Sequence, residues 1–231
     1  MYWKIDESAA FYKKIRTGMP KTEPFDRYSA AYDSWFERHA EEFDAELKLI
    51  RQLMPPGHVE ALEVGVGSGK FAGPLAISTG VEPSAPMAAR AAGLGIDVHD
   101  GVAEQLPFSD ERFDLVLMVT AICFVDDTRQ ALSEAWRVLK PEGCLIVGFV
   151  DRESRLGKEY LARQQNSRFY REALFYSARD VLHLLQHAGF EVAAVRQTLI
   201  PGSSAETIRD GYGDGGFVGI KAKKSKKVEP E

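Results

Sequence analysis

The sequence predicts an α/β fold in which helices cover both faces of a mainly parallel sheet. A short apolar run, residues 61–64, is followed by three glycines at alternate positions, which is typical of a tight turn after a strand. The uniformly apolar run 113–119 predicts a strand that is buried on both faces. Other short apolar runs alternate with amphipathic segments, as the crossover connections of a parallel sheet require.

Composition narrows the class of protein. With 231 residues, 45% of them hydrophobic, the chain can form one domain with a sizeable core, and its net charge of −5 predicts no nucleic-acid partner. Cys123 and Cys144 lie in apolar runs and are expected to be buried free thiols. We find no apolar run of membrane-spanning length and no signal peptide, so we expect a cytoplasmic protein with no membrane partner. The lysine-rich end, residues 223–231, is expected to be disordered.

Residues 1–56 are predicted to form a helical region ahead of the sheet. A short amphipathic helix is expected at residues 5–16, and a longer one from Phe25 to about Met54. Tyr28 and Tyr32 share a face of the longer helix with other aromatic residues. Because tyrosine combines an apolar ring with a polar hydroxyl, this face could belong to the core or to a lid.

The most informative stretch is residues 61–71, ALEVGVGSGKF. A phosphate-binding P-loop is excluded, because Val64 and Phe71 occupy the positions of its first glycine and its hydroxyl residue. A dinucleotide-binding fingerprint is weakened by Lys70, which replaces its third glycine. The remaining pattern, E-x-G-x-G-x-G, resembles the first motif of class I S-adenosylmethionine (SAM) dependent methyltransferases. A purely structural turn also stays open at this point.

The segment that follows the glycines is short and interrupted by Gly73-Pro74. Since proline disrupts a helix interior, any helix between Gly69 and Glu82 is expected to have only one or two turns. Glu82 ends the second predicted strand, where an acidic residue can bind both hydroxyls of a ribose.

The later elements alternate along the chain. An aromatic and arginine-rich insertion, residues 151–176, separates the fifth strand from the last helix, which Ser177 and Asp180 open with a capping-box pattern. Helices are predicted at 85–92, 127–140 and 177–188, and strands at 96–99, 113–119, 144–150, 190–199 and 215–220.

Several segments resemble the small-molecule class I methyltransferases of the ubiquinone and menaquinone biosynthesis group. They are, in order, AYDSWF, LEVGVGSGKF, GVEPS, AEQLPF, FDLVLMV, FVDD and RVLKPEG. The resemblance covers about residues 25–150 and implies a Rossmann-like sheet of seven strands, with helices on both faces and the last strand antiparallel. It places the SAM-binding domain at residues 57–222, with residues 151–176 covering the acceptor. Two further segments resemble a bacterial and archaeal subgroup labelled as acting on histamine-like amines, a label on which we base no expectation.

The resemblance also implies a site for SAM, with S-adenosylhomocysteine as the product. Glu63 is expected near the methionine amino group and Glu82 on the ribose hydroxyls. Many relatives have an aspartate at the position of Val102, so adenine must be held here by backbone and packing, or by Glu104. The implied cofactor-binding residues are Tyr32, Glu63, Gly65, Gly67, Glu82, Pro83, Ala103, Glu104 and Thr120, and the implied substrate-covering residues are Tyr28, Phe169, Tyr170 and Tyr176.

The expected function is transfer of a methyl group from SAM to a small soluble acceptor by in-line displacement. We assign no catalytic residue, since His39 is a weak candidate for a base, and the histidine spacing predicts no metal site. A SAM-binding regulatory or partner-activating protein is the alternative, suggested by Val102 and the short crossover. A nicotinamide-dependent oxidoreductase is disfavoured by Lys70. The acceptor and the oligomeric state are not determined by the sequence.

Overall fold

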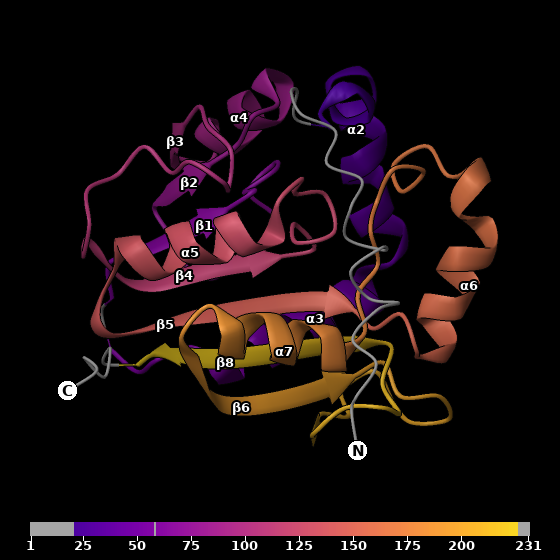
Figure 1. The fold of residues 1–231 in the computed structure, drawn as a ribbon. Helices are drawn as coiled ribbons and strands as arrows, with labels where there is room; N and C mark the ends of the chain where they lie inside the picture. The colour runs from indigo at the N-terminus through magenta and orange to yellow at the C-terminus, as the bar shows by residue number, and fades with distance from the viewer. Residues whose placement is uncertain (1–20, 58, 226–231) are drawn as a thin grey trace, which may run out of the picture.

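The computed structural model describes residues 21–57 and 59–225, and the predicted helix at residues 5–16 lies outside this part. Eight strands form one sheet in the order β3-β2-β1-β4-β5-β8-β6-β7 (Figure 1). Strands β1 to β5 pair in parallel, whereas β8 is antiparallel to both β5 and β6. The parallel α/β fold with an antiparallel last strand is therefore confirmed.

The elements are bounded as follows. The strands are β1 (Ala61–Val64), β2 (Thr79–Val81), β3 (Asp97–His99), β4 (Phe113–Val119), β5 (Leu139–Val150), β6 (Phe190–Thr198), β7 (Arg209–Asp210) and β8 (Phe217–Lys224). The helices are α2 (Glu23–Arg38), α3 (Ala40–Leu53), α4 (Ala85–Ala92), α5 (Thr128–Val138), α6 (Arg155–Arg163) and α7 (Ala178–His187), with a 3-10 turn at Gln164–Asn166.

An apolar cluster lies on each face of the sheet, as the two-sided burial of its central strands requires. On one face, Leu132 of α5 and Leu185 of α7 belong to one buried cluster, in which α5 packs against β5 and α7 against β6 and β8. On the other face, Leu49 and Ile50 of α3 are fully buried against the same sheet. Figure 1 shows α5 and α7 in front of the sheet and α3 behind it, which confirms helices on both faces.

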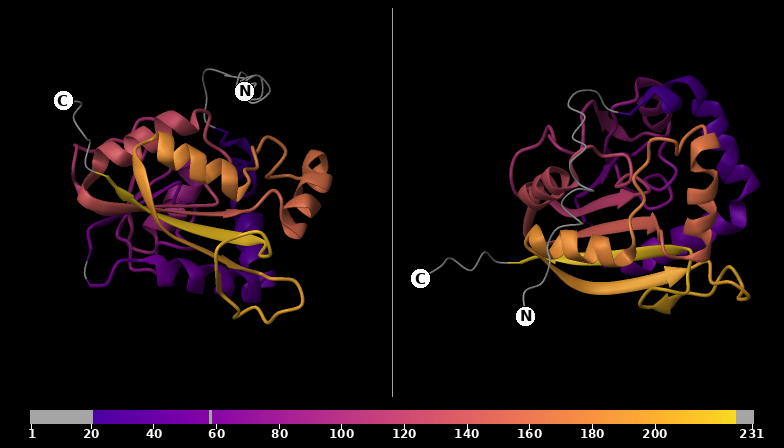
Figure 2. Two further views of the ribbon diagram at one scale, coloured as in Figure 1. Left: turned by 60° about the horizontal axis from the view of Figure 1, so that its bottom comes forward. Right: turned by 45° about the vertical axis from the view of Figure 1, so that its right-hand side comes forward.

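The predicted single helix from Phe25 to Met54 is wrong, because two helices occupy this region. His39, with φ −124° and ψ 43°, ends α2 and precedes α3. Its ring stacks on Trp35 at 4.5 Å between centroids, and its Nδ1 lies 2.9 Å from the Trp35 carbonyl oxygen. The break lets α3 cover the sheet while α2 passes over the ends of the strands (Figure 2).

Two features of the strands also differ from the prediction. The sheet has eight strands rather than seven, because β7 adds a two-residue pairing with Arg196 and Gln197 that no periodicity could reveal. The connection after β1 is short, as expected, and consists of turns with no assigned helix between β1 and β2. Strand β5 begins at Leu139, directly after α5, rather than at residue 144.

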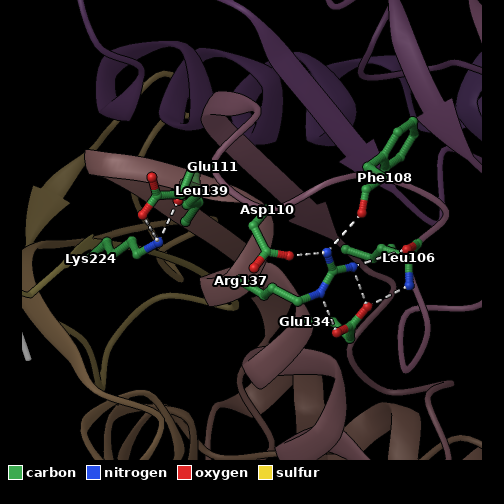
Figure 3. Close-up of polar contacts among 8 residues, drawn as sticks. All are labelled: Leu106, Phe108, Asp110, Glu111, Glu134, Arg137, Leu139 and Lys224. Atoms are coloured by element: carbon green, nitrogen blue, oxygen red, sulfur yellow. Dashed lines mark hydrogen bonds and ion pairs between the residues drawn. The ribbon is translucent and has the colours of Figure 1, made fainter.

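The C-terminal lysines are also placed differently from the prediction. β8 continues to Lys224, past the predicted boundary at residue 222, where we expected a disordered tail. The Lys224 ammonium donates to the Leu139 carbonyl oxygen at 2.6 Å (Figure 3). It also lies 4.0 Å from the centre of the Trp136 ring. A buried ammonium with such partners can end a strand inside the fold. None of the helices in the described ranges is long and apolar enough to cross a membrane.

Candidate functional site

A cavity of about 380 Å³ lies at the carboxyl ends of the parallel strands. Its walls come from the loops after β1, β2, β3 and β4, and α2 contributes Phe25 and Tyr32. Carboxyl-end loops of this kind are the usual place for ligands in open α/β sheets. The predicted residues that line this cavity are Tyr32, Gly65, Gly67, Glu82, Pro83, Ala103, Glu104 and Thr120.

The glycine-rich turn requires glycine at its first two glycine positions. Gly65 and Gly67 have φ values of 71° and 56°, a region that side chains disfavour. A Cβ added to Gly65 would come within 2.8 Å of the Ala121 Cβ. The backbone N–H groups of Gly65 and Val66 donate to the Val81 carbonyl oxygen at 2.8 and 3.0 Å, so the turn is tied to the end of β2.

The Glu82 carboxylate is fixed by two backbone donors. Its Oε2 accepts from the Gly67 N–H and its Oε1 from the Ser84 N–H, both at 2.9 Å. Burial raises the pKa of Glu82, although these two hydrogen bonds oppose the shift. Each oxygen keeps a further lone pair, so the carboxylate can accept two hydroxyl groups from a ligand in the cavity.

Glu63 is the predicted cofactor-binding residue that does not line the cavity, although its charge acts on the Tyr32 hydroxyl, and it lacks a complete set of partners. It is 2% exposed, and its Oε2 has no hydrogen-bond partner. Burial raises its pKa well above the usual range, opposed by a hydrogen bond from the Ala72 backbone. A buried carboxylate oxygen of this kind is costly unless a cation or donor arrives.

Tyr32 and Thr120 meet near this carboxylate. The Tyr32 hydroxyl is hydrogen-bonded to the Thr120 side chain, and its pKa is raised by burial and then by the charges of Glu82 and Glu63. Thr120 has a φ of 51°, a conformation that threonine adopts only under constraint. Its N–H donates to the Gly148 carbonyl oxygen at 2.8 Å, which holds the end of β4 against β5.

On the opposite wall, the side chain of Glu104 accepts hydrogen bonds from two backbone N–H groups. Its Oε1 accepts from the Asp126 N–H at 2.7 Å and from the Asp127 N–H at 3.0 Å. These bonds join the loop after β3 to the loop after β4. The prediction that Glu104 contacts the cofactor remains untested, and its observed contacts fix a wall of the cavity.

Arg137 of α5 is hydrogen-bonded to the loop after β3, the loop that also carries Ala103 and Glu104 (Figure 3). The Arg137 guanidinium donates to the carbonyl oxygens of Leu106 and Phe108 at 3.0 and 2.7 Å, and to Asp110 at 2.8 Å. It also donates to both oxygens of Glu134 at 2.7 Å, and Glu134 accepts from the Leu106 N–H at 2.8 Å. The planar guanidinium thus makes five hydrogen bonds, three to the loop after β3 and two to Glu134 of its own helix.

Two aspartates of α2 attach this helix to the site. Asp33 accepts from the Ser68 hydroxyl at 2.6 Å and from Arg90 at 2.8 Å, so it joins α2 to the glycine-rich turn and to α4. Asp26 accepts from the Ser84 hydroxyl at 2.6 Å. The sequence analysis missed both residues, although their spacing of seven places them on one helix face.

The predicted substrate-covering residues fall into three settings. Tyr28 is 37% exposed beneath the Arg168 guanidinium, which lies 4.2 Å from its ring centre. Phe169 contacts Tyr32 and Tyr170 stacks on Phe124, each with ring centres 5.8 Å apart. Tyr176 lies in the core, where its hydroxyl is 2.8 Å from the Thr128 hydroxyl. None of the four is among the residues that line the large cavity.

Several cavity residues were not predicted. Phe124, Val125, Asp126 and Asp127 follow β4, and their position after a buried parallel strand was the available signal. Lys21 forms an ion pair with Asp126 at 3.1 Å, a long-range contact that no local pattern reveals. Within the described ranges, no group of three or more His, Cys, Asp or Glu residues could hold a metal ion.

Comparisons with known proteins assign this arrangement to a family. Residues 62–147 match the family described as "Methyltransferase domain". A crystal structure from Thermotoga maritima, described as a SAM-dependent methyltransferase and possible histamine N-methyltransferase, is 46% identical with a TM-score of 0.84, covering 88% of this chain and all of that one.

Two curated relatives are also similar to this chain, and one of them is named a methyltransferase. An uncharacterized protein from Methanocaldococcus jannaschii is 40% identical over 87% of this chain and 98% of its own length. A ubiquinone biosynthesis O-methyltransferase from Azorhizobium caulinodans is 30% identical over 62% of this chain and 63% of its own length. The chain belongs to the class I SAM-dependent methyltransferases, with SAM as the methyl donor.

Proposed function

We propose that this enzyme transfers the methyl group of SAM to a small-molecule acceptor by in-line displacement. The observation that carries the proposal is the cavity itself, which joins the glycine-rich turn and Glu82 to an aromatic wall formed by Phe25, Tyr32 and Phe124. The cavity has the size of a small-ligand site, and α2 covers it. A large polymer acceptor would require a more open surface.

The residues present fit SAM. The Glu82 carboxylate, held by two backbone N–H groups, would accept the two ribose hydroxyls. The unpartnered Oε2 of Glu63 would accept the methionine ammonium. Val102, Ala103 and Pro83 would pack around adenine, since all three line the same wall. The aspartate that many relatives have at position 102 would thus be replaced by packing and backbone contacts.

The chain's contribution to the reaction is positioning and exclusion of water. SAM supplies an electrophilic methyl group on a sulfonium centre, so no residue has to activate the methyl donor. Phe25, Tyr32 and Phe124 form apolar walls that keep water from the reacting groups. Correct alignment of two reactants contributes about 7–11 kcal/mol in favourable cases. Aromatic faces also favour a nearby positive charge.

The Tyr32 hydroxyl is expected to orient groups rather than remove a proton. Burial and two neighbouring carboxylates raise its pKa above the ordinary value of a tyrosine, so the hydroxyl stays protonated at neutral pH. The Tyr32 hydroxyl is hydrogen-bonded to the Thr120 side chain, and it can also donate or accept a hydrogen bond in the cavity. We therefore assign no general base among the cavity residues.

The experiment has two steps. Calorimetry first compares binding of SAM, S-adenosylhomocysteine and NAD, and we expect the first two to bind and NAD not to bind. A panel of small amines, phenols, thiols and carboxylic acids is then incubated with SAM, and release of S-adenosylhomocysteine is measured. The Gly65→Val variant, whose side chain would collide with Ala121, is the matched control and should lose both signals.

The outcomes separate the alternatives. Binding of SAM with no turnover across the panel would contradict the proposed small acceptor and favour a regulatory or partner-activating protein. Binding of NAD in preference to SAM would contradict the assigned cofactor site.

A further inference from the structure

A second, smaller pocket lies beside the cavity, at the ends of β4 and β5. Its volume is about 20 Å³, and we call it the side pocket. A space of this volume holds one group of about the size of a water molecule. The side pocket is lined by the segment after β4, by the end of β5 and by four aromatic residues of the insertion, Tyr160, Tyr170, Phe175 and Tyr176.

The segment after β4 separates the side pocket from the cavity. Thr120 lines both spaces. Residues 122–123 line the side pocket, whereas Ala121 and Phe124 line the cavity. The Phe124 ring stacks on Tyr170 of the side pocket, with ring centres 5.8 Å apart and an angle of 19° between the ring planes. The two spaces therefore meet at Thr120 and share a wall that this ring pair completes.

The strand order determines where the side pocket lies along the cavity. The sheet runs β3-β2-β1-β4-β5, and the wall proposed for adenine follows β2 and β3. Gly65 follows β1 and faces Ala121 after β4, since a Cβ on Gly65 would come within 2.8 Å of the Ala121 Cβ. The side pocket comes next, at the ends of β4 and β5. A SAM molecule that crosses the glycine-rich turn from the adenine wall would thus point its methionine end toward Thr120 and the side pocket.

Hydrogen bonds hold the insertion against the segment after β4. The Gln164 side-chain amide donates to the carbonyl oxygens of Tyr170 and Ala173 at 3.1 and 2.7 Å. The Leu174 N–H donates to the Cys123 carbonyl oxygen at 2.8 Å. Cys123 and Ala173 are buried in a small apolar cluster that is separate from the two clusters on the faces of the sheet. The side pocket is therefore formed before a ligand arrives.

The side pocket suits an apolar group. Two of its polar groups already have partners, since the Tyr176 hydroxyl lies 2.8 Å from the Thr128 hydroxyl and the Cys123 thiol donates to the Thr120 carbonyl oxygen at 3.3 Å. The surface of the side pocket is mostly apolar. A water molecule needs two to four polar partners to occupy such a space, whereas an apolar group gains from burial there.

We propose that the side pocket binds a small apolar substituent of the methyl acceptor, of the size of one methyl group, and that Tyr170 limits the size of this substituent. The remainder of the acceptor would lie in the cavity beside Phe25 and Phe124, with the substituent directed past Thr120. Tyr170 is thus a specificity residue that takes no part in a covalent step. This inference rests on the proposed function, because it describes the acceptor of the same site, and it assigns no nucleophilic atom.

The test measures binding to the complex with S-adenosylhomocysteine, so it needs no turnover. Calorimetry compares phenol, 4-methylphenol, 4-propylphenol and hydroquinone, which are soluble aromatic probes that differ only in the group opposite one hydroxyl. 4-Methylphenol should bind about fourfold more tightly than phenol, the factor expected for burial of one methyl group. 4-Propylphenol should bind more weakly than 4-methylphenol, because its chain exceeds the side pocket. Hydroquinone, which replaces the methyl group by a hydroxyl of similar size, should also bind more weakly.

Two variants change the size of the side pocket in opposite directions. Tyr170→Leu removes a ring from its wall and should reverse the native order, so that 4-propylphenol binds more tightly than 4-methylphenol. Cys123→Val adds a methyl group to its lining, so that 4-methylphenol should bind no more tightly than phenol. Tyr212→Leu makes the same change as Tyr170→Leu at an exposed ring outside both spaces, and it should keep the native order. Circular dichroism checks that each variant is folded.

The outcomes distinguish this inference from the proposed function. Equal affinity of the native protein for phenol and 4-methylphenol, tighter binding of hydroquinone, or the native order in Tyr170→Leu would each overturn the inference. Absence of binding by all four probes, with S-adenosylhomocysteine bound, would overturn it as well. Failure of S-adenosylhomocysteine to bind would instead contradict the proposed function.

Discussion

The carboxylates on the two sides of the cavity are held in different ways. On the side of the loops after β2 and β3, which we call the nucleoside side, Glu82 and Glu104 each accept two backbone N–H groups. Two buried carboxylates that do not line the cavity, Glu63 and Glu46, define what we call the acceptor side. One oxygen of Glu63 is unpartnered, and Glu46 has no hydrogen bond among the described residues.

The two sides therefore differ in how their carboxylates can recognise a ligand, by a fixed position on one side and by charge on the other. Backbone donors fix the position of a carboxylate before a ligand arrives, so the nucleoside side is preorganised for neutral hydroxyl groups. On the acceptor side, burial raises the pKa of Glu63 and of Glu46 and so favours their neutral form, which a nearby cation would oppose. A ligand that carries positive charge at one end and hydroxyls at the other matches this division.

The largest effect is expected when the nucleoside side loses Glu82. Glu82→Ala should weaken S-adenosylhomocysteine more than a hundredfold, because two charged hydrogen bonds of about 1.5–3 kcal/mol each are lost. It should also lower the free energy of unfolding by about 1–3 kcal/mol, since the N–H groups of Gly67 and Ser84 lose their acceptor. Calorimetry and urea denaturation measure the two effects. Unchanged affinity would show that Glu82 does not contact the ligand.

The next largest effect is expected when Arg137, which is hydrogen-bonded to the loop after β3, is replaced. Arg137→Met removes five hydrogen bonds to Glu134, Asp110 and the loop carbonyls, and should lower stability by about 1–3 kcal/mol. The affinities for S-adenosylhomocysteine and for 5′-methylthioadenosine should fall by the same factor, about tenfold, because both contain the adenosine that we propose lies against this loop. Arg129→Met, an exposed change on the same helix, is the control. Lower stability with unaltered affinity would show that the loop keeps its shape without Arg137.

On the acceptor side, the test is the dependence of stability on pH. Glu46 has a folded pKa of about 8 against 4.5 for the free side chain, so the folded state binds the extra proton. Its contribution is therefore fully present below pH 4.5 and is lost as the pH rises toward 8. Glu46→Gln should remove this loss, and its advantage over the native protein should grow by a few kcal/mol across that window, at about 1.4 kcal/mol per pKa unit. Parallel stability curves for the two proteins would contradict the buried carboxylate.

Local patterns in the sequence predicted the nucleoside side well. The strand, glycine turn and acidic strand end lie within one short stretch, and the structure brings Gly65, Gly67 and Glu82 into one wall. The acceptor side depends on long-range contacts, such as the hydrogen bond of Tyr32 with Thr120, which no local spacing reveals. For the same reason Asp26 and Asp33 could not be predicted, because their partners lie 58 and 35 residues away.

The smallest effect is expected at the helix that joins the two sides. Asp33→Asn weakens the contacts of α2 with Ser68 and Arg90, which are partly exposed and are expected to contribute about 1 kcal/mol together. Hydrogen exchange should therefore show faster exchange of residues 23–38 in the variant, with little change in β4. Addition of S-adenosylhomocysteine should slow the exchange of α2 in both proteins, since the ligand would contact Tyr32 beneath it.

Tyr28→Ala is the control for this measurement. It lies on the same helix, but its ring is exposed and does not line the cavity, so it should leave ligand protection of α2 unchanged. If α2 exchanges equally with and without ligand in the native protein, it is a fixed wall rather than a lid. In that case the difference between the two sides is built into one rigid site, and ligand entry requires no movement of α2.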